Sequence, residues 1–213
     1  MIFCQIDVGG DRNFAYLIGD AGGGRAALFD PPRGRSLYSR LLGDHSLTVD
    51  YVVLTHGHPD HTWGAAEAAD FTAAKVVAHS SCSYGADLPV NDGDTLPLGA
   101  LTLKFIHTPG HTEDSMCILC EDKLITGDTL FVGKVGGTGF GEDARREYDS
   151  LHKKLMTLSD SVQVYPGHNY GVAPASTIGR EKKTNPFILR DSFESFVDLK
   201  KNWLEYKKKH GIA

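Results

Sequence analysis

The stretch that decides the fold runs from Val53 to His61 and reads VLTHGHPDH. Directly after an apolar, strand-like run, six residues contain four side chains that can bind a metal: His56, His58, Asp60 and His61. Side chains alternate between the two faces of a strand, so His56 and His58 are expected to project to the same side where the strand ends. Neutral imidazole and carboxylate are good ligands for zinc, iron and manganese. The stretch therefore predicts a metal site at the end of a buried strand.

Three later turns each carry one further candidate ligand after a glycine. These turns are Gly110-His111, Gly127-Asp128 and Gly167-His168. Each follows a short strand-like run, and glycine lets the backbone turn closely around a shared centre. Together the four segments supply seven ligand-type side chains, which is the number that two adjacent divalent ions with one bridging carboxylate require.

Short apolar runs bounded by glycine, proline and polar residues predict a series of strands. They lie at residues 3–8, 14–18, 26–29, 49–54, 75–78, 101–106, 116–120, 124–126 and 162–165. Apolar side chains three or four positions apart predict helices at 143–158 and 193–209, and a short helix is expected at 36–42. Because strands lead into helices along the chain, we expect an α/β fold with layered sheets. No repeat or linker interrupts residues 1–213, so we expect one domain with a short helical tail at about 190–210.

The composition excludes several partners. With 22 basic against 27 acidic residues, the net charge is −5, and the chain lacks the basic footprint that nucleic acid requires. No apolar run approaches the ~20 residues that span a bilayer, so no membrane partner is expected. Four cysteines do not make a disulfide scaffold, and residues 1–8 show no secretory signal, so a cytoplasmic protein is expected. The oligomeric state stays open, with a homodimer as one option.

The motif Thr-His-x-His-x-Asp-His at 55–61, followed by the Gly-His, Gly-Asp and Gly-His turns in this order, resembles the metallo-β-lactamase superfamily over essentially the whole chain. The resemblance implies a four-layer αββα sandwich, with two mixed β-sheets packed face to face, helices outside and the metals at one edge. It implies one ion bound by His56, His58 and His111. The second ion would be bound by Asp60, His61 and His168, with Asp128 bridging both.

Within this family, the ligand set points away from β-lactams and towards glyoxalase II-like hydrolases and their relatives. Antibiotic-hydrolysing members typically have Cys or another residue in the second site, whereas this chain has Asp60 and His61 with a bridging Asp128. The set therefore resembles glyoxalase II-like hydrolases, in which two ions lower the pKa of a shared water that attacks a carbonyl. A thioester suits this chemistry because a thiolate leaves without a dedicated general acid. The first expectation is a thioesterase for S-acylglutathione-type substrates such as S-lactoylglutathione, with Asp60 and Asp128 as catalytic carboxylates.

A rival interpretation uses the same residues, and the family resemblance implies that its members retain the remaining motif residues as well, so the ligand set does not separate the two. Persulfide dioxygenases resemble glyoxalase II closely but bind a single iron, through residues matching His56, His111 and Asp128. The tail residues 176–181 and 185–187 resemble both groups. A non-catalytic binding module would be expected to have lost ligands, and this chain has lost none. A metal-dependent nuclease is disfavoured by the acidic balance.

Other features bear on the substrate. Where both groups usually show an Arg-Thr/Ser-Asp-Phe run after the bridging carboxylate, this chain has Gly137-Thr138-Gly139-Phe140, so the usual glutathione contacts and loop bracing are in question. The glycine-rich residues 133–141 are expected to form a mobile loop beside Asp128 and one wall of the cleft. Candidate substrate-binding residues are Tyr170, Arg180 and Lys182. The Cys117 and Cys120 pair is expected to be buried and inert.

Overall fold

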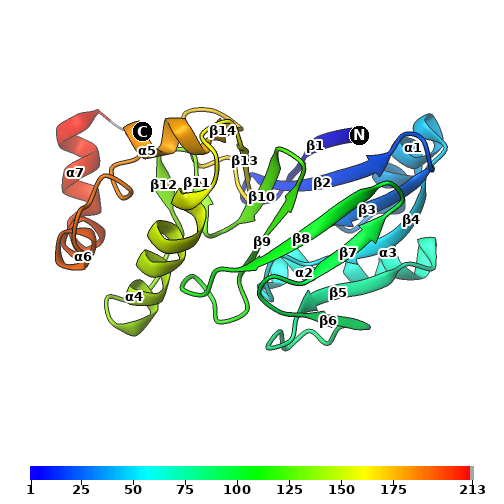
Figure 1. Cartoon of the computed structure of the whole chain (residues 1–213), viewed down its shortest axis with the longest axis horizontal. Helices are drawn as coiled ribbons and strands as arrows, with labels where there is room; N and C mark the ends of the chain where they lie inside the picture. Colours follow the sequence, from blue (N-terminus) through cyan, green and yellow to red (C-terminus); the bar gives the residue numbers. More distant parts are fainter. Residues whose placement is uncertain (212–213) are drawn as a thin grey trace.

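The computed structural model describes residues 1–211, which form two six-stranded sheets packed face to face with helices outside (Figure 1). The first sheet contains the first six strands in chain order: β1 (Ile2–Gly9), β2 (Asn13–Asp20), β3 (Arg25–Phe29), β4 (Thr48–Val53), β5 (Lys75–His79) and β6 (Leu88–Val90). β1 to β3 are antiparallel and β3 to β6 are parallel, so the sheet is mixed.

The second sheet has the order β14-β13-β10-β9-β8-β7. Its strands are β7 (Thr95–Leu98), β8 (Leu101–His107), β9 (Met116–Cys120), β10 (Lys123–Gly127), β13 (Gln163–Pro166) and β14 (Ser176–Thr177). β13 runs parallel to β10, and the other neighbours are antiparallel. A separate hairpin of β11 (Leu130–Phe131) and β12 (Lys134–Val135) follows β10, so part of the expected glycine-rich loop is strand.

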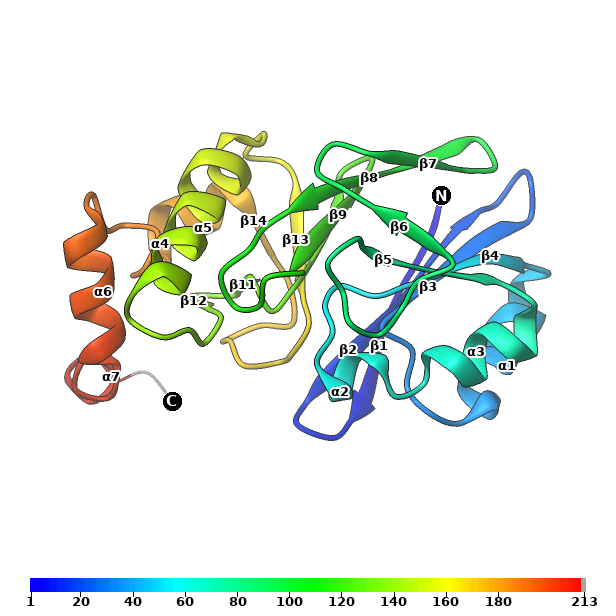
Figure 2. The same ribbon diagram turned by 90° about the horizontal axis from the view of Figure 1, so that it is seen from below.

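Helices cover the outer face of each sheet (Figure 2). The first sheet carries α1 (Arg35–His45), α2 (Pro59–Thr62) and α3 (Ala65–Thr72). The second is covered by α4 (Glu142–Asp149) and α5 (Ile178–Thr184), and α6 (Phe193–Lys201) and α7 (Trp203–His210) lie beyond α4 at the end of the molecule. A π-helical turn (Ser150–Lys154) and a 3-10 turn (Leu155–Thr157) continue α4. The expected αββα sandwich is thereby confirmed. None of the helices within residues 1–211 is long and apolar enough to cross a bilayer.

The main core lies between the sheets. Inward side chains from both sheets pack there, including Tyr16, Phe29, Leu103, Phe105 and Ile118, each at most 1% exposed. These residues alternate with outward positions along their strands, as a two-sheet sandwich requires. The packing fixes the sheets against each other and so brings the strand ends of both sheets to a common edge.

The prediction of one continuous helix at 193–209 is wrong, because the chain breaks at Asn202 between α6 and α7. Asn202 has φ −104° and ψ 18°, and its side-chain amide donates back to the carbonyl oxygen of Asp198 at 3.1 Å. Asparagine competes with helical hydrogen bonding in this way. α6 buries Phe196, Val197 and Leu199, whereas α7 has no buried residue.

The elements that the sequence did not predict are short and lack an apolar period. α3 packs Ala65 and Ala68 against the first sheet, and alanine leaves no visible apolar stripe in the sequence. β6 is an edge strand that contains Pro89. The strands and helices that position the candidate ligands were all expected except α2, which begins at Pro59.

Candidate metal centre

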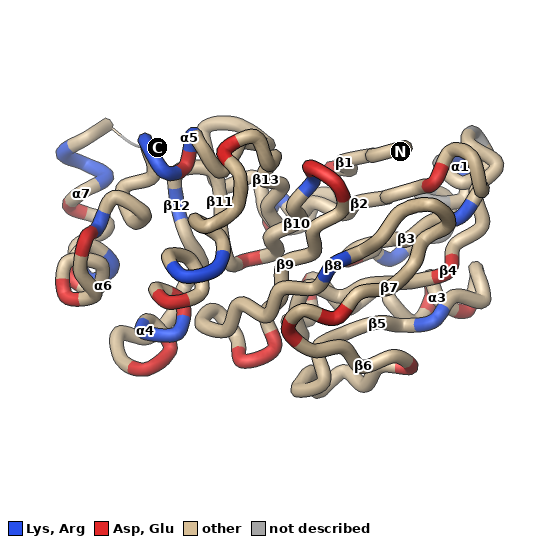
Figure 3. Tube along the Cα trace, in the orientation of Figure 1, with Lys and Arg blue, Asp and Glu red and all other residues tan. Residues whose placement is uncertain are grey.

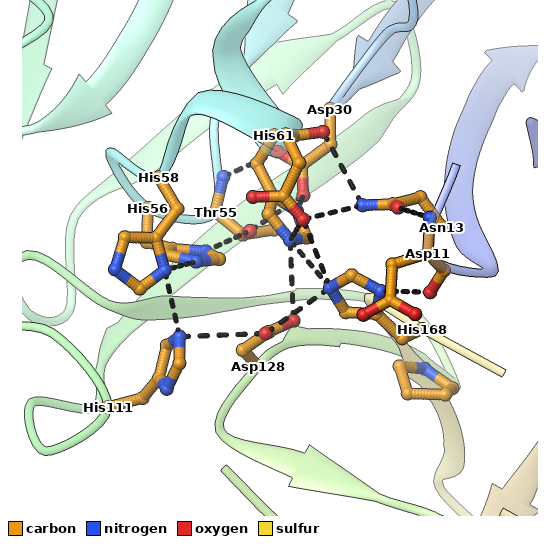
Figure 4. A network of polar contacts seen from close by, with 12 residues as sticks. Asp11, Asn13, Asp30, Thr55, His56, His58, His61, His111, Asp128 and His168 are labelled. Atoms are coloured by element: carbon orange, nitrogen blue, oxygen red, sulfur yellow. Dashed lines mark hydrogen bonds and ion pairs between the residues drawn. The ribbon is translucent and has the colours of Figure 1, made fainter. Parts of the chain in front are cut away.

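Seven candidate ligands meet at one edge of the sandwich, and six of them appear with their polar contacts in Figure 4. His56 and His58 lie on the loop after β4, and Asp60 and His61 lie in α2. The others follow strands of the second sheet: His111 follows β8, Asp128 follows β10 and His168 follows β13. Because β10 and β13 are parallel neighbours, the residues after them emerge at the same edge.

The first group of ligands contains three imidazoles. Nδ1 of His58 lies 3.0 Å from Nε2 of His56 and 3.0 Å from Nε2 of His111. β4 ends at Val53, so alternation along a strand does not bring His56 and His58 together. The loop does so instead, and the two rings present different nitrogens to the shared point. The predicted convergence is correct, but the predicted reason is wrong.

The second group contains Asp60, His61 and His168. Nε2 of His61 lies 3.1 Å from Nε2 of His168. Oδ2 of Asp60 lies 3.6 Å from the former nitrogen and 3.4 Å from the latter. The ligand atoms of this group all lie within 4.8 Å of one another, as do those of the first group.

Asp128 stands between the two groups. Its Oδ1 is 3.4 Å from Nε2 of His61, and its Oδ2 is 3.5 Å from Nε2 of His111 and 3.4 Å from Nε2 of His168. The carboxylate is buried, and Oδ1 accepts no hydrogen bond from the described residues. A buried carboxylate oxygen without a donor is costly unless a cation neutralises it. The donor set and this orphaned oxygen therefore fit a bound metal.

A buried aspartate that the sequence did not single out orients one of the ligands. Oδ2 of Asp30 lies 2.8 Å from Nδ1 of His61 and accepts the Thr55 hydroxyl at 2.6 Å. The Thr55 hydroxyl in turn lies 3.1 Å from Nδ1 of His56. Asp30 follows β3, the parallel neighbour of β4, so its place at a strand end was the available signal. Such outer partners fix the ring orientation of metal-binding histidines.

Backbone carbonyls orient two further histidines. Nδ1 of His111 donates to the carbonyl oxygen of Gly137 at 2.8 Å, and Nδ1 of His168 donates to that of Asp11 at 2.9 Å. These contacts leave Nε2 of both rings free to face the centre. Asn13, also not predicted, donates its amide to Oδ2 of Asp60 at 2.9 Å.

Two of the predicted glycines are required by close approach. A Cβ at Gly127, where φ is +46°, would lie 2.7 Å from Cβ of Thr55. A Cβ at Gly167 would lie 2.4 Å from Oδ1 of Asp128 and 2.8 Å from Cε1 of His61. All of these distances are shorter than a side chain tolerates, so the residue before Asp128 and the residue before His168 must each be glycine.

The electrostatics suit metal binding. Burial holds the pKa of His56 well below its usual range, so its ring is neutral. Burial alone would raise the pKa of Asp128, but the hydrogen bond from His168 and the nearby charge of His61 hold that pKa well below its usual range. Burial likewise opposes the charge of His61, yet the Asp30 carboxylate raises its pKa to about 9. In the metal-free protein His61 therefore holds the proton that a metal would displace.

Of the three candidate substrate-binding residues, two line a cavity and the third does not. The Tyr170 ring stacks on His168, with 4.6 Å between ring centroids and 2° between planes, and its hydroxyl donates to the Asp11 carboxylate. Tyr170 and Arg180 both line a cavity of about 430 Å³. Lys182 is not brought to this place, because its ammonium donates to Oδ1 of Asp160 at 2.6 Å and to the Leu158 carbonyl at 3.2 Å.

A second cavity, of about 420 Å³, opens onto the ligands themselves. His111 and Asp128 line it, and it shares Lys134, Tyr170 and Trp203 with the first cavity. Residues 136–138 form part of its wall, as the sequence predicted for the glycine-rich segment. The metal centre is therefore open to a small molecule from the side of the C-terminal helices.

The Cys-x-x-Cys pair lies apart from this chemistry. Cys117 packs outside the second sheet, whereas Cys120 packs between the sheets, because residues three apart on a strand face opposite sides. Burial raises the pKa of each thiol to about 11. The prediction that both thiols are buried is confirmed, and their inertness stays a prediction.

A histidine and aspartate cluster at the edge of an αββα sandwich defines a class of metal-dependent proteins. The chain belongs to the metallo-beta-lactamase superfamily, whose family model matches residues 8–81 and 83–168. Metal binding by the cluster and membership of an enzyme superfamily follow from the same match.

Relatives with two different names resemble the chain. A hydroxyacylglutathione hydrolase of Anaeromyxobacter dehalogenans is 32% identical over 90% of this chain and 87% of its own length. The human mitochondrial persulfide dioxygenase ETHE1 is 33% identical over 89% of this chain and 76% of its own length. The crystal structure of ETHE1 from Myxococcus xanthus superposes with a TM-score of 0.89 and 35% identity, covering 95% of this chain and 91% of that chain.

Proposed function

We propose that the protein is a metal-dependent thioesterase that hydrolyses S-acylglutathione-type thioesters. The observation that carries the proposal is the second ligand group, Asp60, His61 and His168, which shares Asp128 with the first group. The described residues thus offer a complete ligand set for a second ion, which activation of a shared water by two ions requires. The proposed cofactor is a pair of divalent ions, zinc, iron or manganese, because imidazole and carboxylate accept all three.

The proposed ligand assignment follows the geometry. The first ion would be held by His56, His58 and His111, the second by Asp60, His61 and His168, and Asp128 would bridge them. When bound, such ions lower the pKa of water and polarise a carbonyl oxygen. Asp60 and Asp128 supply the negative charge that keeps two cations close together.

The cavity beside Tyr170 suits an anionic thiol carrier. Its lining includes four cations that come from separate segments: Arg12, Lys134, Arg180 and Lys207. Figure 3 shows basic residues on β12, α5 and α7 at the end of the molecule that holds the C-terminus. Burial lowers the pKa of Lys134, and the nearby Lys207 and Arg12 lower it further, which reflects a positive potential. The carboxylates of glutathione are the proposed partners of these cations.

The chain's own residues then position the substrate. Tyr170 is held between His168 and the cations Arg12 and Lys134, which lie 4.7 Å and 4.9 Å from its ring centre. Its hydroxyl is engaged by Asp11, so Tyr170 supplies a support for the Arg12 and Lys134 cations rather than a proton. A thiolate leaving group needs no protonation by the enzyme, so the proposed reaction does not require a dedicated general acid.

The alternative is a persulfide dioxygenase with a single iron. The proposed ligands are His56, His111 and Asp128, two histidines and a carboxylate of the kind that handles O₂. The similarity to proteins named persulfide dioxygenase and ETHE1 favours this alternative. In either case the proposed substrate is a small glutathione-derived molecule.

The proposed setting is a single-domain cytoplasmic protein. All four cysteines are free, which agrees with a reducing compartment.

Parallel assays on zinc-, iron- and manganese-loaded protein test the proposal. One assay follows hydrolysis of S-D-lactoylglutathione, and the other follows O₂ uptake with glutathione persulfide. We expect metal-dependent hydrolysis and no O₂ uptake. Iron-dependent O₂ uptake without thioester hydrolysis would overturn the thioesterase and support the dioxygenase.

A further inference from the structure

A buried ion pair joins the C-terminal helix α6 to α4. Lys200 of α6 contacts Glu147 of α4, and their side chains are 7% and 1% exposed. The same ammonium donates a hydrogen bond to the carbonyl oxygen of Gly136 at 2.8 Å. A lysine ammonium carries three donors and no acceptor, so one group can hold both a carboxylate and a carbonyl.

The carbonyl that Lys200 binds belongs to the segment that orients a metal ligand. Gly137, the next residue, accepts the hydrogen bond from Nδ1 of His111 at 2.8 Å. Gly136 lies tightly between the pair and the ligands. A Cβ there would lie 2.1 Å from the carbonyl oxygen of Asp128, 3.1 Å from Cβ of His111 and 3.2 Å from Oε1 of Glu147.

Glu147 also packs against the residue that precedes His111. A Cβ at Gly110 would lie 2.4 Å from Cβ of Glu147 and 2.5 Å from its Cα. The backbone of α4 therefore contacts the His111 loop directly, while Lys200 holds the segment whose Gly137 carbonyl binds the His111 ring. Both contacts meet at a single ligand.

A purely structural ion pair would not need this arrangement. Taking two charges out of water is costly, and a well-packed apolar pair of similar volume usually stabilises a fold at least as well. An apolar pair cannot donate a hydrogen bond to Gly136. Gly137 and Gly139 stand where the related enzymes usually have Arg and Asp, so the sequence put the bracing of this loop in question. In this chain Lys200 supplies the bracing, because it reaches the same segment from the C-terminal helix α6.

We propose that Lys200, held in place by Glu147, is a positioning residue for the metal ligand His111. It acts through the Gly136 carbonyl and the Gly137 carbonyl that follows, and it makes helix α6 part of the support of the metal centre. This inference rests on metal binding by the cluster and not on which reaction the protein catalyses.

Cobalt(II) binding tests the inference, because its visible spectrum and its affinity both report on the ligands of the first group. The variants are Lys200→Met, Lys200→Arg, Glu147→Gln and the double variant Lys200→Met with Glu147→Gln. Lys200→Met keeps the length of the side chain and removes the hydrogen-bond donor. The matched control is Lys182→Met, because Lys182 also binds one carboxylate and one backbone carbonyl but lies outside the two cavities.

For Lys200→Met we expect a changed cobalt spectrum and a roughly 10–100-fold loss of affinity, which is typical for the loss of an outer partner of a metal ligand. Lys200→Arg should restore most of the affinity, and the double variant should lose no more than Lys200→Met alone. Lys182→Met should match the wild type.

Wild-type spectrum and affinity in Lys200→Met and Glu147→Gln, with only a lower unfolding midpoint, would show that the pair is structural and overturn the inference. If Lys200→Met does not fold, Glu147→Gln and Lys200→Arg decide by the same spectrum. Thioester hydrolysis plays no part in these readouts, so failure of the proposed reaction would leave this test intact.

Discussion

Oδ2 of Asp30 lies 2.8 Å from Nδ1 of His61 and also accepts the Thr55 hydroxyl. Its Oδ1 accepts the backbone N–H of Thr55 at 2.8 Å, so one buried carboxylate holds both ends of the stretch from Thr55 to His61. Asp30 is not a ligand itself. From the end of β3, the parallel neighbour of β4, it orients the two ends of this ligand-bearing stretch.

Asp30→Asn should weaken metal binding at the second group without unfolding the protein. The amide would present a donor where the carboxylate accepts three hydrogen bonds, so His61 would lose its fixed orientation. We expect a roughly 10–100-fold loss of zinc affinity in a chelator competition titration. Asp50→Asn is the control, since Asp50 binds Arg25 at the surface. Unchanged zinc affinity in Asp30→Asn would refute the assigned role.

Gly167→Ala should damage the metal centre more than the fold. The new Cβ would lie 2.4 Å from Oδ1 of Asp128 and would force that carboxylate or His61 to move. We expect the purified variant to hold less metal by elemental analysis while keeping a wild-type circular dichroism spectrum. Gly141→Ala serves as control, because a Cβ there has nothing within 4 Å. Equal metal content in the two variants would contradict the geometry.

The pH dependence of stability should change in Glu147→Gln. Burial raises the pKa of Glu147 to about 7 from a usual value of 4.5, so the folded state binds this proton more tightly than the unfolded state. The contribution is fully present below the unfolded value and is lost as the pH rises through 7. Between pH 4.5 and pH 8, the wild type should lose on the order of 3 kcal/mol of unfolding free energy relative to the variant.

Urea unfolding of the metal-free proteins at several pH values measures this difference. The metal-free state removes the pH dependence of metal binding, and titration of the candidate ligands is common to both proteins and cancels in their difference. Parallel stability curves for the wild type and Glu147→Gln would mean that Glu147 does not titrate with a raised pKa.

The thiols of Cys117 and Cys120 should resist modification in the native protein. Burial raises the pKa of each to about 11, so almost no thiolate is present at pH 8, and both side chains are fully buried. We expect a disulfide reagent to label neither residue until urea is added, as located by mass spectrometry, with the half-buried Cys4 as internal reference. Rapid labelling of either one in the native state would show a reactive pair.

The fold and the clustering of the candidate ligands were predictable because their signals are local. The stretch from His56 to His61 holds four ligands within six residues, and the later three each follow a glycine at the end of a strand. The break at Asn202 was missed because the apolar period continues across it, and the marks of the end of α6 are the backbone angles of Asn202 and its side-chain bond to Asp198.

The supporting residues were not predictable, because their roles depend on contacts between distant segments. Asp30 reaches His61 through the parallel register of β3 and β4. Lys200 reaches Gly136 across 64 positions of the chain. Conversely, Lys182 is only two positions after Arg180 in the sequence, yet the turn of helix α5 places its side chain against Asp160 and away from the cavity.

The measurement that tests the central claim most directly is S-D-lactoylglutathione hydrolysis by Asp60→Ala, with metal content determined on the same sample. Asp60 belongs only to the second ligand group. We predict a fall from two ions to one per chain and a loss of hydrolysis of at least about 100-fold, because one ion alone gives up the shared activation of water. Wild-type hydrolysis in a variant that binds one ion would contradict a two-metal thioesterase.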